Sequence, residues 1–303
     1  MKKYTTAHNR PLVTVIIPVF NGASFLVEAI ESVQKSTFRD FEIILVDDGS
    51  TDNSKMVCHM LDEKYKNLRF YDFKENQGLG HVLNYALKKA HGKYICRLNQ
   101  DDRMLPHRMG IQVAFLAKNP DIVAVGSHIN HFFENGEMEV LKYLETDREI
   151  KEIWHIVGPF SDPSVMYRRE IALKVGGYDH SFWPVDDTHL WYRMGMAGKL
   201  ANIQKPLVEV RWHEKAGSVY FFREMAWQIY RVRRWAHKNI KKGTIWHQIF
   251  WIMQLAAGMI LTPKMNWKAY RYIKKGITWY ENRKKQVNRF TLKFPALIGN
   301  PFK

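Results

Sequence analysis

Two adjacent carboxylates, Asp101 and Asp102, are the residues of this sequence whose chemistry is easiest to place. They end the stretch Arg-Leu-Asn-Gln-Asp-Asp and follow an apolar run, 93–98, whose β-branched and aromatic residues predict a strand. Ligands of open α/β sheets bind outside the carboxyl ends of the strands, and carboxylates there suit Mg²⁺ or Mn²⁺ carrying a phosphorylated substrate. The pair therefore predicts a metal-diphosphate site. The alternative interpretation is a turn that caps the next helix, with Pro106 near the first helical position.

Alternating strands and helices surround this pair and must position it. Apolar β-branched runs are followed by segments with helical spacing throughout 13–126, which predicts an α/β fold with a doubly wound, mostly parallel sheet flanked by helices. A second acidic loop, 47–52, then lies on the same edge of the sheet as 99–102. The predicted elements are strands 13–19, 41–46 and 68–73 and helix 79–90, with a turn at Asn21-Gly22 and a helix N-cap at Ser24.

After the strand predicted at 122–126 the pattern is less regular, and local signals define the elements. Thr146 followed by Glu149 is a capping box that predicts the start of a helix. The other predictions are a hairpin turning at Asn135-Gly136, a turn at 176–179, a helix over 187–197 ending at Gly198, and a last strand, 206–212, that leads to His213.

The net charge of +16 belongs to the last part of the chain. Residues 220–303 carry 18 Lys and Arg but only Glu224 and Glu281, so the first 219 residues hold 28 basic and 28 acidic side chains. This asymmetry predicts a boundary near residue 219 and an anionic partner for the basic segment. Cys58 and Cys96 show no disulfide or zinc spacing, and no apolar run follows the N-terminal lysines, so we expect a cytoplasmic protein.

The basic segment contains two further patterns. Residues 245–261 are mostly apolar but short for a bilayer span, and they predict a buried or interfacial helix. Within residues 264–280, aromatic and apolar residues mark one helical face and basic residues mark another. This pattern is typical of a membrane-surface helix. We therefore expect peripheral association of 220–303 with the anionic inner face of the cell membrane. A helical cap with a solvated basic face is the alternative.

Several short motifs occur in a consistent order along the chain. They are Val15 to Gly22, Val46 to Asp52, Asn76-Gln77-Gly78 with Asn84, Arg97 to Asp102, Gly176 to Asp179, Asp186-Asp187 with Leu190-Trp191 and Arg193, and Arg211-Trp212-His213. Together they resemble the family 2 glycosyltransferases, whose nucleotide-sugar-binding fold is called GT-A. The resemblance covers 11–219 and implies a nucleotide-binding half, 11–126, and an acceptor-side half, 127–219.

The resemblance also implies roles for individual residues. Asp187, with Asp186 as the less favoured choice, matches the general base. Asp102, Asp101 and His213 match the residues around a Mn²⁺ or Mg²⁺ ion, although Asn99 stands where many members carry a further Asp. The positions that match the nucleotide-sugar site are Pro18, Phe20, Asn21, Asp48, Gly78, Asn84, Arg97, Asp101 and Arg211.

The implied activity is a metal-dependent, inverting transfer of a sugar from a UDP-sugar to a hydroxyl of a lipid-linked glycan, in bacterial surface polysaccharide biosynthesis. Transfer to a polyprenyl phosphate, which needs no base, is one alternative, and a nucleotidyltransferase on a similar sheet is another. A non-catalytic module whose basic tail binds nucleic acid is a third. Nucleic acid is not the expected partner, because the sequence has no nucleic-acid-binding signature.

Overall fold

The computed structural model describes residues 10–133, 136–213, 216–262, 264–266, 268–269, 271–273 and 276. The chain divides into two compact units, Met1–Met259 and Ile260–Lys303. In the second unit the described residues 264–266, 268–269 and 271–273 are helical, and the rest of the amphipathic pattern predicted over 264–280 lies outside the described residues.

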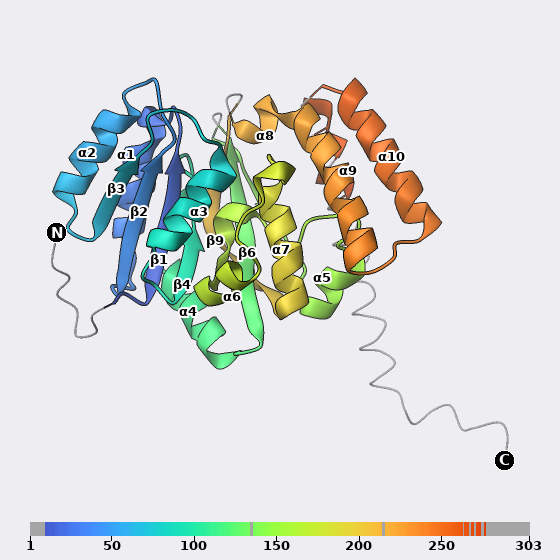
Figure 1. The fold of residues 1–303 in the computed structure, drawn as a ribbon, viewed down its shortest axis with the longest axis horizontal. Coiled ribbons are helices and arrows are strands. Elements are labelled where there is room, and N and C mark those ends of the chain that lie inside the picture. Colours follow the sequence, from blue (N-terminus) through green and yellow to red (C-terminus); the bar gives the residue numbers. More distant parts are fainter. Residues whose placement is uncertain are drawn as a thin grey trace, which may run out of the picture. The chain divides into compact units, whose positions relative to one another are not determined.

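One mixed sheet forms the centre of the first unit (Figure 1). Its strand order is β3-β2-β1-β4-β8-β6-β9-β5, and β7 pairs with β6. The first four strands in the chain are parallel to one another, as the βαβ pattern predicted, whereas β8 runs antiparallel to β4 and β6. The strands are β1 Val13–Val19, β2 Phe41–Asp47, β3 Leu68–Asp72, β4 Tyr94–Arg97, β5 Arg103–Met104, β6 Ile122–Phe133, β7 Met138–Leu141, β8 Met166–Arg168 and β9 Lys199–Trp212.

Helices flank the sheet, so the predicted α/β architecture is confirmed. The helices are α1 Ala23–Gln34, α2 Ser54–Lys64, α3 Leu79–Lys89, α4 Arg108–Lys118, α5 Asp147–Ile153, α6 Arg169–Lys174, α7 Asp186–Ala197, α8 Gly217–Tyr220, α9 Phe222–Asn239 and α10 Ile245–Ile260, with 3₁₀ turns at Asp162–Ser164 and His180–Phe182.

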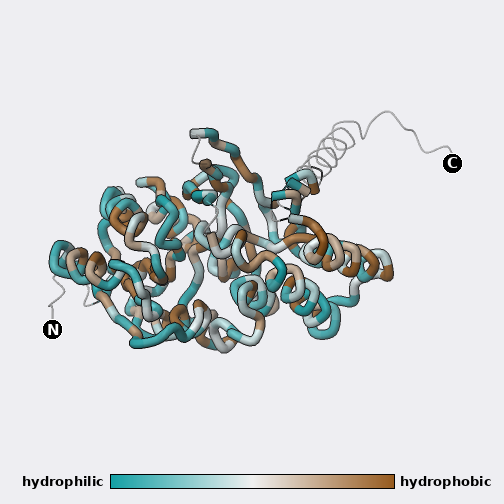
Figure 2. Tube along the Cα trace, turned by 90° about the horizontal axis from the view of Figure 1, so that it is seen from above, coloured by the Kyte–Doolittle hydropathy of each residue, from teal (hydrophilic) through white to brown (hydrophobic). Residues whose placement is uncertain are grey.

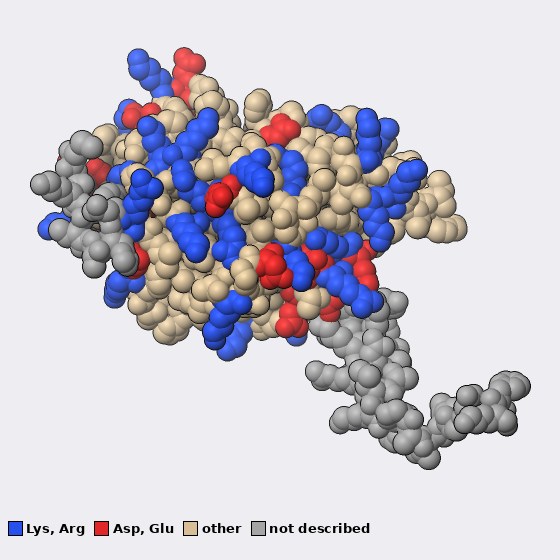
Figure 3. Space-filling model, turned by 60° about the horizontal axis from the view of Figure 1, so that its bottom comes forward, with Lys and Arg blue, Asp and Glu red and all other residues tan. Residues whose placement is uncertain are grey.

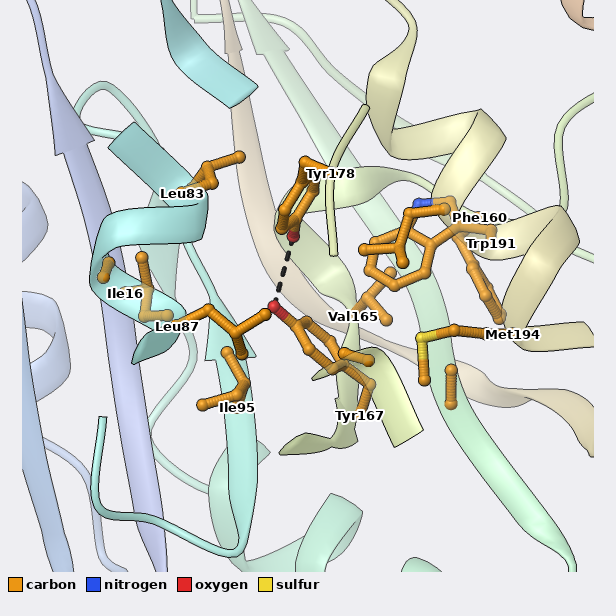
Figure 4. Close-up of a cluster of buried hydrophobic side chains, with 14 of the residues drawn as sticks. Ile16, Leu83, Leu87, Ile95, Phe160, Val165, Tyr167, Tyr178, Trp191 and Met194 are labelled. Atoms are coloured by element: carbon orange, nitrogen blue, oxygen red, sulfur yellow. Dashed lines mark hydrogen bonds between the residues drawn. The ribbon is translucent and has the colours of Figure 1, made fainter. Parts of the chain in front are cut away.

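The main core lies between the sheet and helices α3 and α7. Leu83 and Leu87 of α3 and Trp191 of α7 pack there with apolar residues of β1, β2, β4 and β8 (Figure 4). The hydroxyls of Tyr167 and Tyr178 are 3.2 Å apart within this apolar cluster. They hydrogen-bond to each other, so neither is buried without a partner. The core thus fixes α3 and α7 against the same sheet, and both helices begin at the edge where the acidic loops lie.

Local signals were correct in part. The capping box is present, because Thr146 accepts from the backbone of Glu149 and the Glu149 carboxylate accepts from the backbone of Thr146. The N-cap predicted at Ser24 is wrong: α1 begins at Ala23, and Gly22 precedes it without a side-chain cap. The alternative role of Asp101 and Asp102 as helix caps is also wrong, since the residue before α4 is His107.

Helices α9 and α10 belong to the first compact unit. Val232 and Ala236 of α9 pack against Trp154 and Tyr192, and the Trp251 indole of α10 donates to the carbonyl of His155 at 2.6 Å. The unit therefore ends later in the chain than the change in charge at residue 219, although a separate function for 220–303 stays a prediction. Within the described part of the chain, no helix is both long and apolar enough to span a bilayer.

Candidate functional site

The carboxyl ends of β1 and β2 are joined by the side chain of Asn21. Asn21 has a positive φ of 48°, a conformation that Asn adopts more readily than most residues. Its carboxamide oxygen accepts from the backbone N–H groups of Thr51 at 2.9 Å and Asp52 at 3.3 Å. The predicted nucleotide-binding residue therefore shapes the turn, and a ligand would meet a loop that Asn21 has already ordered.

Phe20, the predicted nucleobase contact, keeps an accessible ring. Its side chain is 45% exposed, while its backbone is held by Gln100, which accepts from Phe20 N and donates to Phe20 O, both at 2.9 Å. Gly22 leaves room for the Gln100 carboxamide, because a Cβ at residue 22 would lie 2.2 Å from it and the carboxamide would have to move. The sequence reasoning missed Gln100, since its partner lies 80 residues earlier in the chain.

Asp48, at the end of β2, fixes the loop before α3. Its two carboxylate oxygens accept from Gln77 N at 2.7 Å and from Gly78 N at 3.0 Å. Gly78 has a φ of 90°, which favours glycine, and it directly precedes α3. Burial raises the pKa of Asp48, and the two backbone hydrogen bonds oppose that rise. Each carboxylate oxygen has two lone pairs, so both can still accept from a ligand. Pro18 lies opposite Val46, one strand position before this edge.

Beyond β4 the two carboxylates meet the end of β9. Strand β5 follows Asp102 directly and pairs with β9 at Val208 and Glu209, which brings the 101–102 loop beside residues 211–213. Asp101 Oδ2 and His213 Nε2 are 2.9 Å apart, and Asp102 Oδ1 accepts from the backbone N–H of Arg211 at 3.0 Å. The predicted metal residues are therefore neighbours, although they come from opposite ends of the domain sequence.

These side chains fit a divalent cation only as part of a larger ligand set. Within the described residues there is no group of three His, Cys, Asp or Glu side chains that could hold a metal ion alone. Asp101 and His213 offer an oxygen and a nitrogen ligand, and the phosphates of a nucleotide supply the remaining oxygens in many Mg²⁺ and Mn²⁺ sites. Asp102 is buried, and its Oδ2 accepts from Asn99 at 3.0 Å. Burial, and then the charge of Asp101, raise the pKa of Asp102 well above its usual value.

Arg211 is used mainly within the protein. Its Nε donates to the carbonyl of Asp101 at 3.1 Å, its guanidinium pairs with Glu28, and it lies 4.5 Å from the centroid of the Phe132 ring. These contacts hold β9 and the 101–102 loop together. A phosphate contact by Arg211, which the sequence predicted, would have to coexist with them.

Arg97 is fully buried and reaches across the sheet edge. Its guanidinium donates to the carbonyl of Ile16 at 3.1 Å, to Asn99 Oδ1 at 3.0 Å and to Asp162 Oδ2 at 2.8 Å. Both terminal nitrogens of Arg97 thus bond within the protein, and its contact with a nucleotide sugar stays a prediction. Asp162 was missed by the sequence reasoning, since its partner lies 65 residues away and Asp162-Pro163 reads locally as a turn.

The predicted general base lies at the start of α7. Asp187 is half-buried and its Oδ1 accepts from the backbone N–H of Thr188 at 2.6 Å, whereas Asp186 is buried. Burial raises the pKa of Asp186 to about 7, and the charge of Asp162 adds to the rise. Burial, with the charges of Asp162 and Asp186, also raises the pKa of Asp187. The more accessible Asp187 is the better placed of the two to take a proton from a ligand.

Two buried carboxylate oxygens of this group are unsatisfied. Within the described part of the chain, Asp162 Oδ1 and Asp186 Oδ2 have no hydrogen-bond partner. Gly80 of α3 lies against Asp186, because a Cβ at Gly80 would be 2.5 Å from Asp186 Oδ2. The start of α3 therefore touches the residue that precedes the predicted base.

Asn84, another predicted ligand-binding residue, pins a turn instead of facing open space. Its carboxamide donates to Tyr178 O at 2.7 Å and accepts from Tyr178 N at 2.8 Å. Gly177 has a φ of 67° and lies so close that a Cβ would be 2.2 Å from the Asn84 oxygen. Asn84 thus ties α3 to the turn that precedes α7.

Solved structures share this fold. The structure of S. aureus TarS 1–349 in complex with UDP aligns with a TM-score of 0.60 and 18% identity, covering 82% of this chain and 70% of that one. A mannosyltransferase from Pyrobaculum calidifontis in complex with GDP-Man and Mn²⁺ aligns with a TM-score of 0.60 and 20% identity, covering 89% of this chain and 83% of that one. At these identities the likeness establishes the GT-A fold.

Curated relatives add sequence similarity. A glycosyltransferase of Rickettsia conorii is 30% identical over 71% of this chain, and the chain spans 37% of that relative's length. The amylovoran biosynthesis glycosyltransferase AmsE of Erwinia amylovora is 26% identical over 73% of this chain and 85% of AmsE. An Escherichia coli galactosyltransferase, named for its action on GlcNAc-diphosphoundecaprenol, is 26% identical over 68% of this chain and 76% of its own length.

The family model of glycosyl transferase family 2 matches residues 14–176, which include β1, the acidic loops, β4 and Asp162. The matched range is more than half of the 303 residues. It contains each site element described above except the turn at Gly177 and Tyr178, the start of α7 and the end of β9. The chain belongs to glycosyl transferase family 2, a family of transferase enzymes.

Proposed function

We propose that this protein is a metal-dependent, inverting glycosyltransferase that moves a sugar from a UDP-sugar to a hydroxyl of a lipid-linked glycan in bacterial surface polysaccharide biosynthesis. One observation carries the proposal. A chain of hydrogen bonds runs from Asp102 through Asn99 and Arg97 to Asp162, whose charge acts on Asp187. It joins the predicted donor side to the predicted base.

The donor side supports a nucleotide diphosphate sugar. Asp48 has acceptor capacity left for the N3–H of uracil, and the exposed Phe20 ring lies on the neighbouring strand end. The TarS structure contains UDP, and the Pyrobaculum mannosyltransferase contains GDP-Man. A carboxylate at position 48 complements the N3–H of uracil and equally the N1–H of guanine. We favour UDP because the resemblance to the family matches Asp48 with a carboxylate that accepts from uracil.

The proposed reaction needs one proton transfer and one departing diphosphate. Asp187 accepts the proton of the acceptor hydroxyl while that oxygen bonds to the anomeric carbon, and the bond from this carbon to the diphosphate oxygen breaks on the opposite face. A positioned base contributes roughly 10²- to 10⁴-fold to the rate. A pKa raised by burial and by Asp162 makes the Asp187 carboxylate a stronger base than an exposed one. A bound divalent ion, held by Asp101 and His213, would stabilise the charge of the leaving diphosphate.

The acceptor assignment rests on relatives. AmsE is named for amylovoran biosynthesis, and the Escherichia coli relative is named for transfer to a diphosphoundecaprenol-linked GlcNAc. A lipid-linked glycan would bring the site to the inner face of the cell membrane, where the basic segment 220–303 meets anionic lipid.

The test is thermal stability with UDP, GDP and their sugars, in the presence of Mn²⁺ or of a chelator. A ligand at a hundredfold excess over its Kd stabilises the folded state by about 2.7 kcal/mol. We expect a shift with UDP or one UDP-sugar that requires the metal. In Asp101→Asn, addition of the metal should no longer produce this shift. Asp121→Asn is the control, because it changes a carboxylate that pairs with Lys199 at the opposite end of β9 from residues 211–213. A shift that is independent of metal, or that occurs with GDP alone, would refute the corresponding part of the proposal.

A further inference from the structure

Helix α10 has two faces with different surroundings. One face packs against α9 and the segment after α5. Trp251 donates to the carbonyl of His155, and Gln254 accepts from Arg233. Gly258 lies so close to Ala226 that a Cβ at residue 258 would be 2.4 Å from the Ala226 Cβ. These contacts tether the helix along most of its length. Its position is therefore fixed by packing, and its other face is a surface of the folded protein.

The other face is apolar and exposed. Residues at intervals of one, three, four and seven positions share it, and each exposes between 40% and 75% of its surface. We call this surface the α10 outer face, and its members are Ile245, Trp246, Ile249, Ile252, Met253 and Met259. Contiguous exposed apolar surface of this kind marks sites of protein or membrane interaction. Figure 2 shows hydrophobic colouring along much of α10.

We propose that the α10 outer face is a membrane-binding surface that inserts into the headgroup region of an anionic bilayer. This inference rests on the proposed function, since a lipid-linked acceptor requires the transferase to reach a membrane. It assigns the contact to a particular face of a particular helix. The helix has 16 residues, or about 24 Å at 1.5 Å per residue, so it lies in the interface instead of spanning the bilayer.

Charge identifies the occupant. No residue of α10 is Asp, Glu, Lys or Arg, and exposed Lys241 and Lys242 precede it. Basic side chains beside an inserted apolar face gain attraction from anionic lipid, and salt weakens this attraction. A second copy of this chain would instead bring like charges together around the shared apolar patch. Figure 3 shows Lys and Arg beside uncharged surface on the side of the molecule where α9 and α10 lie.

The experiment is co-sedimentation of the full chain with vesicles of phosphatidylcholine alone or with phosphatidylglycerol. We expect binding to the anionic vesicles that weakens with salt, and a loss of at least about tenfold in the double variant Trp246→Ser, Ile252→Asn. Met56→Asn and Met60→Asn on α2 are the matched control, because these apolar residues are 57% and 58% exposed. Thermal melting reports whether each variant is folded.

The outcomes separate this inference from the reaction. Unchanged vesicle binding by the double variant would overturn it. A wild-type protein that does not bind vesicles but forms a dimer, which the double substitution dissociates, would also overturn it. Protection of the α10 outer face by residues 277–303, seen as vesicle binding that appears only after their removal, would also overturn it for the full chain. UDP-sugar turnover on a water-soluble acceptor depends on the catalytic site alone, so a failure of transfer leaves the vesicle result unaffected.

Discussion

The donor side and the acceptor side of the site differ in how their polar groups are satisfied. On the donor side, both oxygens of Asp48 accept backbone hydrogen bonds, and Asn21 and Gln100 complete backbone groups of neighbouring loops. On the acceptor side, Asp162 and Asp186 each keep a buried oxygen without a partner in the described structure. Burial raises the pKa values of carboxyls on both sides, but the oxygens of Asp48 and Asp102 accept hydrogen bonds, whereas these oxygens of Asp162 and Asp186 do not. A rigid binding surface beside groups ready to take up protons is what a transfer to a hydroxyl requires.

Removing the base should have the largest effect on this difference. We expect Asp187→Asn to reduce the rate of transfer by about 10²- to 10⁴-fold, because an amide cannot take the proton. Stabilisation by UDP and Mn²⁺ should remain, since Asp48, Asp101 and His213 are unchanged. Initial rates with a saturating donor measure the first effect and melting curves the second. Full activity in this variant would instead favour an acceptor that is already an anion.

The pair of Arg97 and Asp162 is the next largest contribution. Asp162→Asn leaves a fully buried guanidinium without its carboxylate, which typically destabilises a protein by about 3 to 5 kcal/mol. Urea denaturation measures this loss. The same variant should shift the acidic limb of the pH–rate profile to lower pH, because the charge of Asp162 raises the pKa of Asp187 and the base acts only when it is deprotonated. An unchanged profile would mean that Asp162 has only a structural role.

The pH dependence of stability tests Asp186. The pKa of Asp186 is about 7 in the folded protein against 3.8 as its ordinary value, so the folded state binds the proton more tightly. Stability from this group is therefore present below about pH 4 and is lost as the pH rises to about 7, by at most about 4 kcal/mol. Asp186→Asn should flatten that part of the stability curve. A decline of equal size in the variant would assign the pH dependence to another group.

The smallest expected effect is on the donor side. Gln100→Ala removes two hydrogen bonds to the backbone of Phe20 and should reduce stability by about 1 to 2 kcal/mol. It should also weaken UDP binding a few-fold, because the strand end that carries Phe20 becomes less ordered. Gln204→Ala is the matched control, since its carboxamide, on β9, also donates to backbone carbonyls, but to those of Tyr143 and Asn202 instead of Phe20. Equal loss of UDP affinity in both variants would remove the special role of Gln100.

Sequence patterns predicted elements whose signals are local. Strand β1 matches the predicted bounds, because a run of apolar β-branched residues buried on both faces has few other interpretations. Strand β9 begins at Lys199, earlier than the predicted 206, since its first half includes polar residues and is held by pairing with β6. That pairing is non-local, so no pattern within 199–205 indicates it.

The site follows the same rule. The motifs predicted that the acidic loops lie at one edge of the sheet. The partners that define the environment of Asp187 and Phe20 are distant in sequence, so the motifs did not include them. Asp162 and Gln100 could not be distinguished from ordinary turn residues without the fold. Helical spacing also could not say which of Trp246 and Trp251 faces outward, because both are Trp on the same helix and only packing separates them.

The double hydrogen bond between Asn84 and Tyr178 has a kinetic consequence. The Asn84 carboxamide occupies both backbone groups of Tyr178, so we expect α3 and the turn before α7 to move together. The N-terminus of α3 is held by Asp48 on the donor side, and α7 carries Asp187 on the acceptor side. A donor that orders the start of α3 should therefore also fix the position of Asp187. We expect the two substrates to bind in a fixed order, with the nucleotide sugar first and the acceptor second.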